Sequence, residues 1–166
     1  INAESYPWLA GGLTTYFEDI YQQDFQSNDI KDYSEFKSFY FPYLYWGQRL
    51  RIAEPLNARR SILDKDHEFL NRYYKSAAFL YFLYALVGKE NFSAALSHFI
   101  ESKETLTPHK LIEKLEQNSG LALKDIAESY ISKSCETDYK IQSANYIDPK
   151  LQVSLENLKA DEFPFI

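Results

Sequence analysis

The stretch that decides the fold is residues 68–87, EFLNRYYKSAAFLYFLYALV. Apolar and aromatic side chains occupy nearly every side of a helix built from it, which is typical of a helix contacted all round. Its uninterrupted apolar run, Ala77–Gly88, is well short of the roughly 20 residues that a membrane-spanning helix needs. We therefore predict a central core helix over residues 68–87, with Gly88 as its stop.

Three further segments carry apolar residues at the i, i+3, i+4 and i+7 spacing of one stripe along an amphipathic helix. The first predicts a helix over Ala10–Gln22, and the other two predict helices around residues 92–100 and 123–131. The stripes consist of Leu13, Tyr16, Phe17, Ile20 and Tyr21; Phe92, Ala95, Leu96, Phe99 and Ile100; and Leu123, Ile126, Ala127, Tyr130 and Ile131.

Local end signals define one more helix between the last two stripes. Thr107 followed by Pro108 is typical of an N-cap with proline at the first helical position, where its missing N–H costs nothing. Gly120 suits the left-handed position just after a helix. These signals predict a helix over Pro108–Ser119.

Other segments are less regular. Ser34–Ile52 has apolar residues at mostly helical intervals, but Pro42 removes a backbone donor, so we predict two short helices there. Asn57–Asp66 mixes charged and small polar residues without a period and predicts a loop.

The pattern changes to period two after Lys133. Tyr139 and Ile141, and later Leu151, Val153 and Leu155, alternate with polar residues, which predicts half-buried strands. The expected organisation is a helical body over residues 1–135 and an extended tail over residues 136–166, the start of a following β module. The predicted fold class is mainly α, without internal repeats.

Charge and composition narrow the classes of partner. The net charge of −6 argues against nucleic acid, because binding it needs clustered Lys and Arg. Hydrophobic and charged shares of 45% and 25% are typical of a soluble globular protein, and 14 Tyr and 12 Phe predict a core rich in rings. Cys135 is the only cysteine, and we expect it to be an inert, small apolar residue. The cysteine content therefore does not indicate the cellular compartment of the protein. One small basic cluster, expected to be a solvated face, comprises Arg49, Arg51, Arg59 and Arg60.

Motifs for common chemistries are lacking. The three histidines, His67, His98 and His109, have no zinc-ligand spacing, and the chain contains neither a phosphate-binding glycine loop nor a GxSxG elbow. An acidic group of Asp64, Asp66, His67 and Glu68 has the residue types of a metal site, but it lies where a loop meets the start of the central helix, where acids favour the helix dipole. The residues by themselves therefore identify no metal or nucleophile site.

Two stretches, residues 8–18, WLAGGLTTYFE, and residues 73–77, YYKSA, match known motifs. The first resembles the WLNEGFATYFE helix of the aminopeptidase N-like zinc metallopeptidases, a gluzincin family, and the second resembles the YxKGA motif of that family. Pro55 stands where the family often has a short proline segment, and residues 86–92, LVGKENF, are similar to its LGExxF link. The resemblance covers residues 7 to about 142. It implies an orthogonal helical bundle, the C-terminal subdomain of a gluzincin peptidase domain.

The same resemblance implies that the zinc site is incomplete. Gly11 occupies the position of the Glu that is the family's third zinc ligand, and glycine has no side chain to bind metal. Tyr73 matches the Tyr that stabilises the oxyanion in the family. The family's HExxH helix lies upstream and would precede Ile1, so we expect the chain to be a piece of a longer protein. Zinc is the family's cofactor, but this chain is expected to hold none and to be inactive alone.

Three functions remain open from the sequence. The first is a pseudo-peptidase region that binds a peptide or a protein. The missing N-terminal part of its own domain is one such protein partner. The second is the helical half of an active zinc metallopeptidase whose HExxH lies outside this chain and whose third ligand is Glu18 or a residue outside this chain. A distance of about 10 Å along the helix between Glu18 and position 11 argues against Glu18. The third is a helical protein-interaction module. Tyr73 could equally be a packing residue of the central helix with its hydroxyl at a cleft edge.

Overall fold

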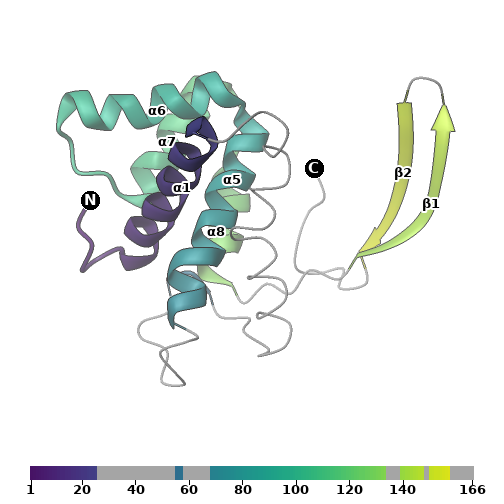
Figure 1. The fold of residues 1–166 in the computed structure, drawn as a ribbon, viewed down its shortest axis with the longest axis horizontal. Helices are drawn as coiled ribbons and strands as arrows, with labels where there is room; N and C mark the ends of the chain where they lie inside the picture. Colours follow the sequence, from purple (N-terminus) through teal and green to yellow (C-terminus); the bar gives the residue numbers. More distant parts are fainter. Residues whose placement is uncertain (26–54, 58–67, 134–138, 148–149, 158–166) are drawn as a thin grey trace.

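A computed structural model of the chain describes residues 1–25, 55–57, 68–133, 139–147 and 150–157 (Figure 1). Within these residues the fold is mainly helical, with a small two-stranded antiparallel sheet near the C-terminus. Several sequence predictions lie outside them: the two short helices of Ser34–Ile52, the loop from residue 58 to Asp66, the four-arginine cluster, Cys135, and the acidic group except Glu68.

Helix α1, Pro7–Phe25, confirms the first predicted helix and extends it at both ends. Pro7 is its first residue, where a missing N–H leaves no hydrogen bond unmade. Trp8, Leu9 and Tyr16 are buried on its inner face. Phe17 was predicted on the same stripe but is half exposed, because it lies at the edge of the core with its ring edge-on to Tyr16.

The central helix is present and has two geometries. Leu70–Lys75 forms a π-helical segment, η3, and α5 continues directly from Ser76 to Val87. Gly88, with φ of 82°, ends α5 as predicted, because that backbone conformation is one that residues with a side chain rarely adopt. The π-helical turn was not predicted. The Ser76 hydroxyl donates a 2.9 Å hydrogen bond to the Asn71 carbonyl within this wider turn.

The next three helices confirm the predictions for residues 92–100, 108–119 and 123–131. They are α6 (Lys89–Ser102), α7 (Pro108–Ser119) and α8 (Lys124–Ser132). The Thr107 hydroxyl accepts a 3.3 Å hydrogen bond from the Lys110 N–H, and Gly120 has φ of 74°, so both end signals of α7 act as predicted. The start of α8 is capped from another helix: one carboxylate oxygen of Glu116 accepts from the N–H groups of Leu123 and Lys124 at 2.7 and 2.9 Å.

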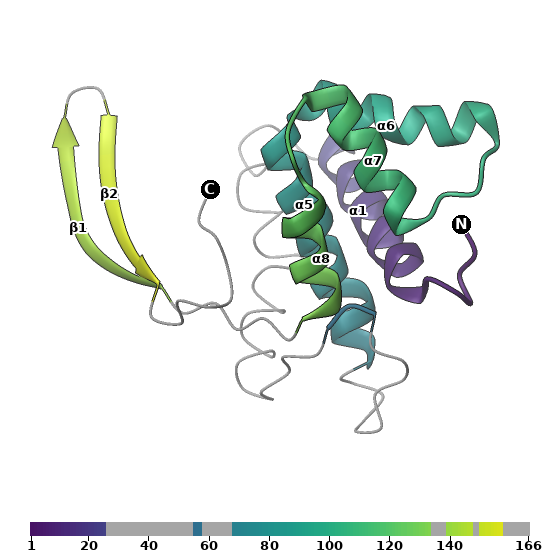
Figure 2. The same ribbon diagram turned by 180° about the vertical axis from the view of Figure 1, so that it is seen from behind.

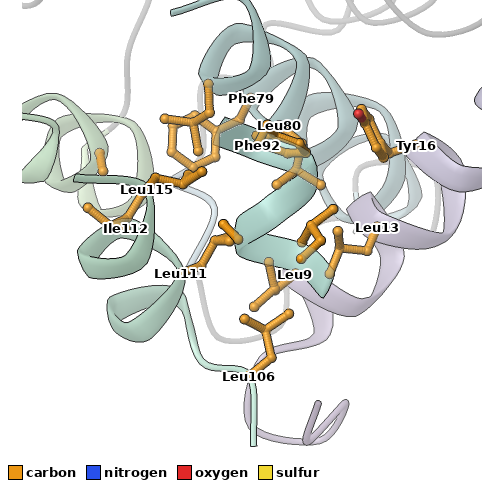
Figure 3. Close-up of a cluster of buried hydrophobic side chains, with 14 of the residues drawn as sticks. Leu9, Leu13, Tyr16, Phe79, Leu80, Phe92, Leu106, Leu111, Ile112 and Leu115 are labelled. Carbon is orange, nitrogen blue, oxygen red and sulfur yellow. The ribbon is translucent and has the colours of Figure 1, made fainter. Parts of the chain in front are cut away.

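The core surrounds α5. Helix α1 lies beside it in both views, and α8 packs on it through Tyr130, whose ring stacks on Phe79 at 4.9 Å (Figures 1 and 2). Phe92 of α6 lies 5.3 Å from the Tyr16 ring and thereby joins α6 to α1. Figure 3 shows Tyr16, Phe79 and Phe92 converging with the leucine and isoleucine side chains of α7. The labelled members are Leu9, Leu13, Tyr16, Phe79, Leu80, Phe92, Leu106, Leu111, Ile112 and Leu115.

Residues 55–57 connect two helical segments of the bundle. The Asn71 side-chain amide donates to the Pro55 carbonyl at 3.0 Å, and the backbone N–H of Asn57 donates to the Ile131 carbonyl at 3.1 Å. Leu56 between them is buried in the core. This short segment therefore links η3 to the end of α8.

The tail forms an antiparallel hairpin of β1 (Tyr139–Ile147) and β2 (Lys150–Asn157). An irregularity between Ile141 and Ser143 shifts the register, so that the apolar pairs Ala144–Val153 and Tyr146–Leu151 share a face with Ile141. The strands confirm the period-two prediction, but the prediction of half-burial was wrong. Both views show the hairpin apart from the described helices, and residues 141–147 and 151–154 are all exposed (Figure 2).

No helix among the described residues is long and apolar enough to cross a membrane. The apolar run of α5 is instead explained by its contacts with α1, α6 and α8 in the bundle.

Candidate functional site

The two glycines of α1 allow unusually close contact with η3 and α5. A Cβ atom on Gly11 would lie 2.6 Å from the Arg72 carbonyl oxygen and 2.9 Å from the Arg72 Cγ. A Cβ on Gly12 would lie 2.7 Å from the Ser76 Cβ. Glycine in the middle of a helix costs about 1 kcal/mol relative to alanine, so the pair is explained by this contact rather than by helix preference.

Position 11 is therefore a helix contact. Gly11 is buried, and the stem and carbonyl of Arg72 fill the space that a side chain at this position would need. Glu18, two turns further along α1, is exposed to solvent. The position that the sequence resemblance assigned to a zinc ligand has no room for a carboxylate in this packing.

Tyr73 lies in η3, one residue after the contact with Gly11, and is partly buried. Its ring lies 4.8 Å from that of Phe69, which is 49% exposed, and the Arg72 guanidinium carbon lies 5.6 Å from its centroid. We call the surface formed by Phe69, Arg72 and Tyr73 the η3 face. The structure thus places the Tyr73 ring close to both an exposed aromatic ring and a cation.

Two buried polar atoms in η3 lack hydrogen-bond partners in the structure: the side-chain oxygen of Asn71 and the Nε of Arg72. The amide nitrogen of Asn71 is used, since it binds the Pro55 carbonyl. Leaving a buried polar group unpaired costs about 1–3 kcal/mol, so such atoms are uncommon in folded proteins. Both occur within the π-helical segment, a type of structure that is frequent at functional sites.

A second polar group lies deeper, between α1 and α5. Asp19 is 4% exposed and accepts a 2.8 Å hydrogen bond from the Tyr81 hydroxyl, while Lys75 is 1% exposed. The hydrogen bond joins Asp19 of α1 to Tyr81 of α5, and each of the three residues makes a further interaction. The sequence predictions missed it. The available signal was Lys75, a charged residue in a helix that is otherwise apolar all round.

Removing the Tyr81 hydroxyl should destabilise the fold. We expect Tyr81→Phe to lower the free energy of unfolding by about 1–3 kcal/mol, because a buried carboxylate oxygen of Asp19 loses its donor. Urea denaturation followed by circular dichroism measures this. Tyr74→Phe is the matched control, since Tyr74 is partly buried in the preceding segment and no hydrogen bond of its hydroxyl is described. Equal effects of the two substitutions would refute a role for the hydrogen bond.

The histidines lie apart from these groups. His109 is exposed, His98 is partly buried with its ring edge-on to Phe99, and His67 lies outside the described residues. His98 lines a shallow depression of about 160 Å³ with Glu104 and Lys110, which form an exposed 3.2 Å ion pair. Within the described ranges, no three His, Cys, Asp or Glu side chains gather as they would around a metal ion.

Comparison with known proteins adds no assignment to these residues. No family model, no curated protein and no solved structure matches the chain.

Proposed function

We propose that this chain is a non-catalytic, peptidase-like helical region that binds a peptide or an extended protein segment at the η3 face. The resemblance of residues 8–18 and 73–77 to the aminopeptidase N-like motifs motivates the peptidase part. In the resembling family, the two motifs belong to one catalytic cleft. Here they lie against each other through the contact of Gly12 with Ser76, next to the contact of Gly11 with Arg72.

The observation that carries the proposal is the burial of Gly11 under Arg72. A zinc ligand at position 11 would need a side chain. The Cβ atom of that side chain would lie only 2.6 Å from the carbonyl oxygen of Arg72. The close packing of α1 against η3 at position 11 is compatible with peptide binding at the surface. It is not compatible with a zinc site in which residue 11 is a ligand. Without a metal, Tyr73 has no metal-polarised carbonyl whose developing charge it could stabilise.

Binding is supported by the exposed part of the same face. Phe69 is a large aromatic residue that is half exposed, and its ring contacts the rings of Tyr73 and Tyr74 at 4.8 and 5.5 Å. Aromatic and arginine side chains held by neighbours are the residue types that most often anchor a bound partner. Such a cluster offers a rigid apolar contact beside a positive charge.

Zinc content separates this proposal from the active-peptidase alternative. We expect less than about one tenth of a zinc per chain in the longest native form after purification in zinc-containing buffer, because position 11 supplies no ligand. Metal analysis measures the content, and a peptidase assay of Tyr73→Phe beside the wild type measures any residual activity. Stoichiometric zinc, or a peptidase rate that falls with Tyr73→Phe, would establish a substitute ligand and refute the proposal.

Peptide selection tests the binding itself. A display library of random peptides is selected on the native protein and then compared on Phe69→Ser and on Ile100→Ser. Both residues are exposed, but Ile100 lies on α6, away from the η3 face. We expect selected peptides to lose binding to Phe69→Ser and to keep it with Ile100→Ser. Loss with neither variant would place the binding elsewhere and favour a general helical interaction module.

A further inference from the structure

Arg72 is a cation without a counter-ion in the part of the chain that the structure describes. Its side chain makes no ion pair and no hydrogen bond there, and its Nε is buried without a partner. Its one recorded interaction beyond the contact with Gly11 is with the Tyr73 ring, 5.6 Å from the guanidinium carbon. Arginine stays protonated in proteins, so its charge cannot be relieved by losing a proton.

The surroundings hold the guanidinium in place before any partner binds. The Arg72 stem lies over Gly11, in space that a larger residue would occupy, and its head lies near the face of Tyr73. A side chain fixed in this way loses little conformational entropy when it binds, and partial burial strengthens its attraction for an anion. Charge-assisted hydrogen bonds from arginine to carboxylate are about twice as strong as neutral ones.

We propose that the peptide bound at the η3 face is held by a carboxylate paired with Arg72, with an adjacent apolar side chain against Phe69. This inference rests on the proposed function and names the chemistry of its ligand. The carboxylate is either the peptide's C-terminus or an Asp or Glu side chain, since both present the same pair of oxygens to a guanidinium. Arg72 thus supplies positive charge beside the position where the resembling family holds its zinc.

The net charge of the whole chain does not favour the binding of a peptide carboxylate. The chain carries a net charge of −6, so an acidic peptide is repelled at long range. Any preference of the protein for carboxylate must therefore arise locally. It should also weaken as salt is raised, because the partly exposed pair is screened.

The test uses four synthetic pools of random peptides as probes and the immobilised native protein. The pools end in a free carboxylate or an amide, and each form is made with and without Asp and Glu. We expect the pools that contain a carboxylate to be retained at least about tenfold more than the neutral amide pool. Comparing the free-acid pool lacking Asp and Glu with the amide pool containing them identifies the source of the carboxylate.

Variants assign the preference to Arg72. Arg72→Gln should abolish the difference between acidic and neutral pools, and Arg72→Lys should keep part of it, because lysine retains the charge but not the planar fork. Lys124→Gln removes an equal charge from the exposed start of α8 and should change nothing. Circular dichroism confirms that each variant is folded.

The outcomes separate the two proposals. Equal retention of neutral and acidic pools by the wild type, or a preference that survives Arg72→Gln, refutes the proposed pairing of a carboxylate with Arg72. The proposal of peptide binding at the η3 face is not affected by either result. Retention of no pool above a blank surface refutes peptide binding and the carboxylate with it.

Discussion

Gly11→Glu, which restores the residue that the resembling family uses as its zinc ligand, is expected to destabilise the fold by more than about 4 kcal/mol. Its Cβ would lie 2.6 Å from the Arg72 carbonyl oxygen, so α1 and η3 would have to separate. Overpacking typically costs about 1–3 kcal/mol, and an unpaired buried charge adds several more. Urea denaturation followed by circular dichroism measures the loss, and metal analysis shows whether the variant binds zinc.

The matched control is Thr14→Glu. Thr14 is exposed on the same helix, so the same new side chain should change stability by no more than about 0.5 kcal/mol there. A Gly11→Glu protein with wild-type stability would show that the helices can open at this point. If that protein also bound stoichiometric zinc, the active-site interpretation of position 11 would replace the packing one.

Phe92→Ala is expected to cost about 3–5 kcal/mol of unfolding free energy. Phe92 is fully buried, and its ring joins α6 to Tyr16 at 5.3 Å and to Tyr84 at 5.8 Å. Truncation leaves a cavity among three helices, and the loss combines the transfer of the ring with the contacts that the cavity no longer makes. Urea unfolding of the variant and the wild type, with equal slopes, measures the difference.

Ile100→Ala, on the same helix, is the control for this substitution. Ile100 follows the same sequence stripe as Phe92 but is 72% exposed, so its truncation should cost no more than about 0.5 kcal/mol. Similar losses for the two variants would mean that Ile100 is covered in solution. A small loss for Phe92→Ala would mean that the ring packs more loosely than the structure places it.

Local signals predicted the helices well. Thr107, Pro108 and Gly120 gave α7 its observed bounds, because a cap, a fixed φ and a left-handed residue act within one helical turn. Hydrophobic spacing located α1, α6 and α8 to within a few residues, but it did not distinguish buried from edge positions. Phe17 and Ile100 follow the stripes and yet are exposed, because each lies where no other described helix covers it.

The π-helical turn of η3 escaped prediction because its causes are not local. Its sequence, LNRYYK, suits an α-helix as well as a π-helix. The wider turn lies where α1 presses against Arg72 and Ser76 through two glycines about 60 residues away in the chain. The spacing of apolar residues within 70–75 does not depend on that contact, so it could not predict the π-helical turn.

The sequence by itself determined which segments of the described chain are helix or strand, since periodicity and end signals depend on neighbouring residues. It also placed Gly11 and Tyr73 in motifs that resemble a peptidase, a hypothesis that remains a prediction. Only the tertiary structure decided that Gly11 is a helix contact, that Arg72 faces no carboxylate among the described residues, and that the hairpin is exposed. These properties depend on which distant surfaces meet, and a side chain's neighbours across a helix interface are set by packing rather than by its place in the chain.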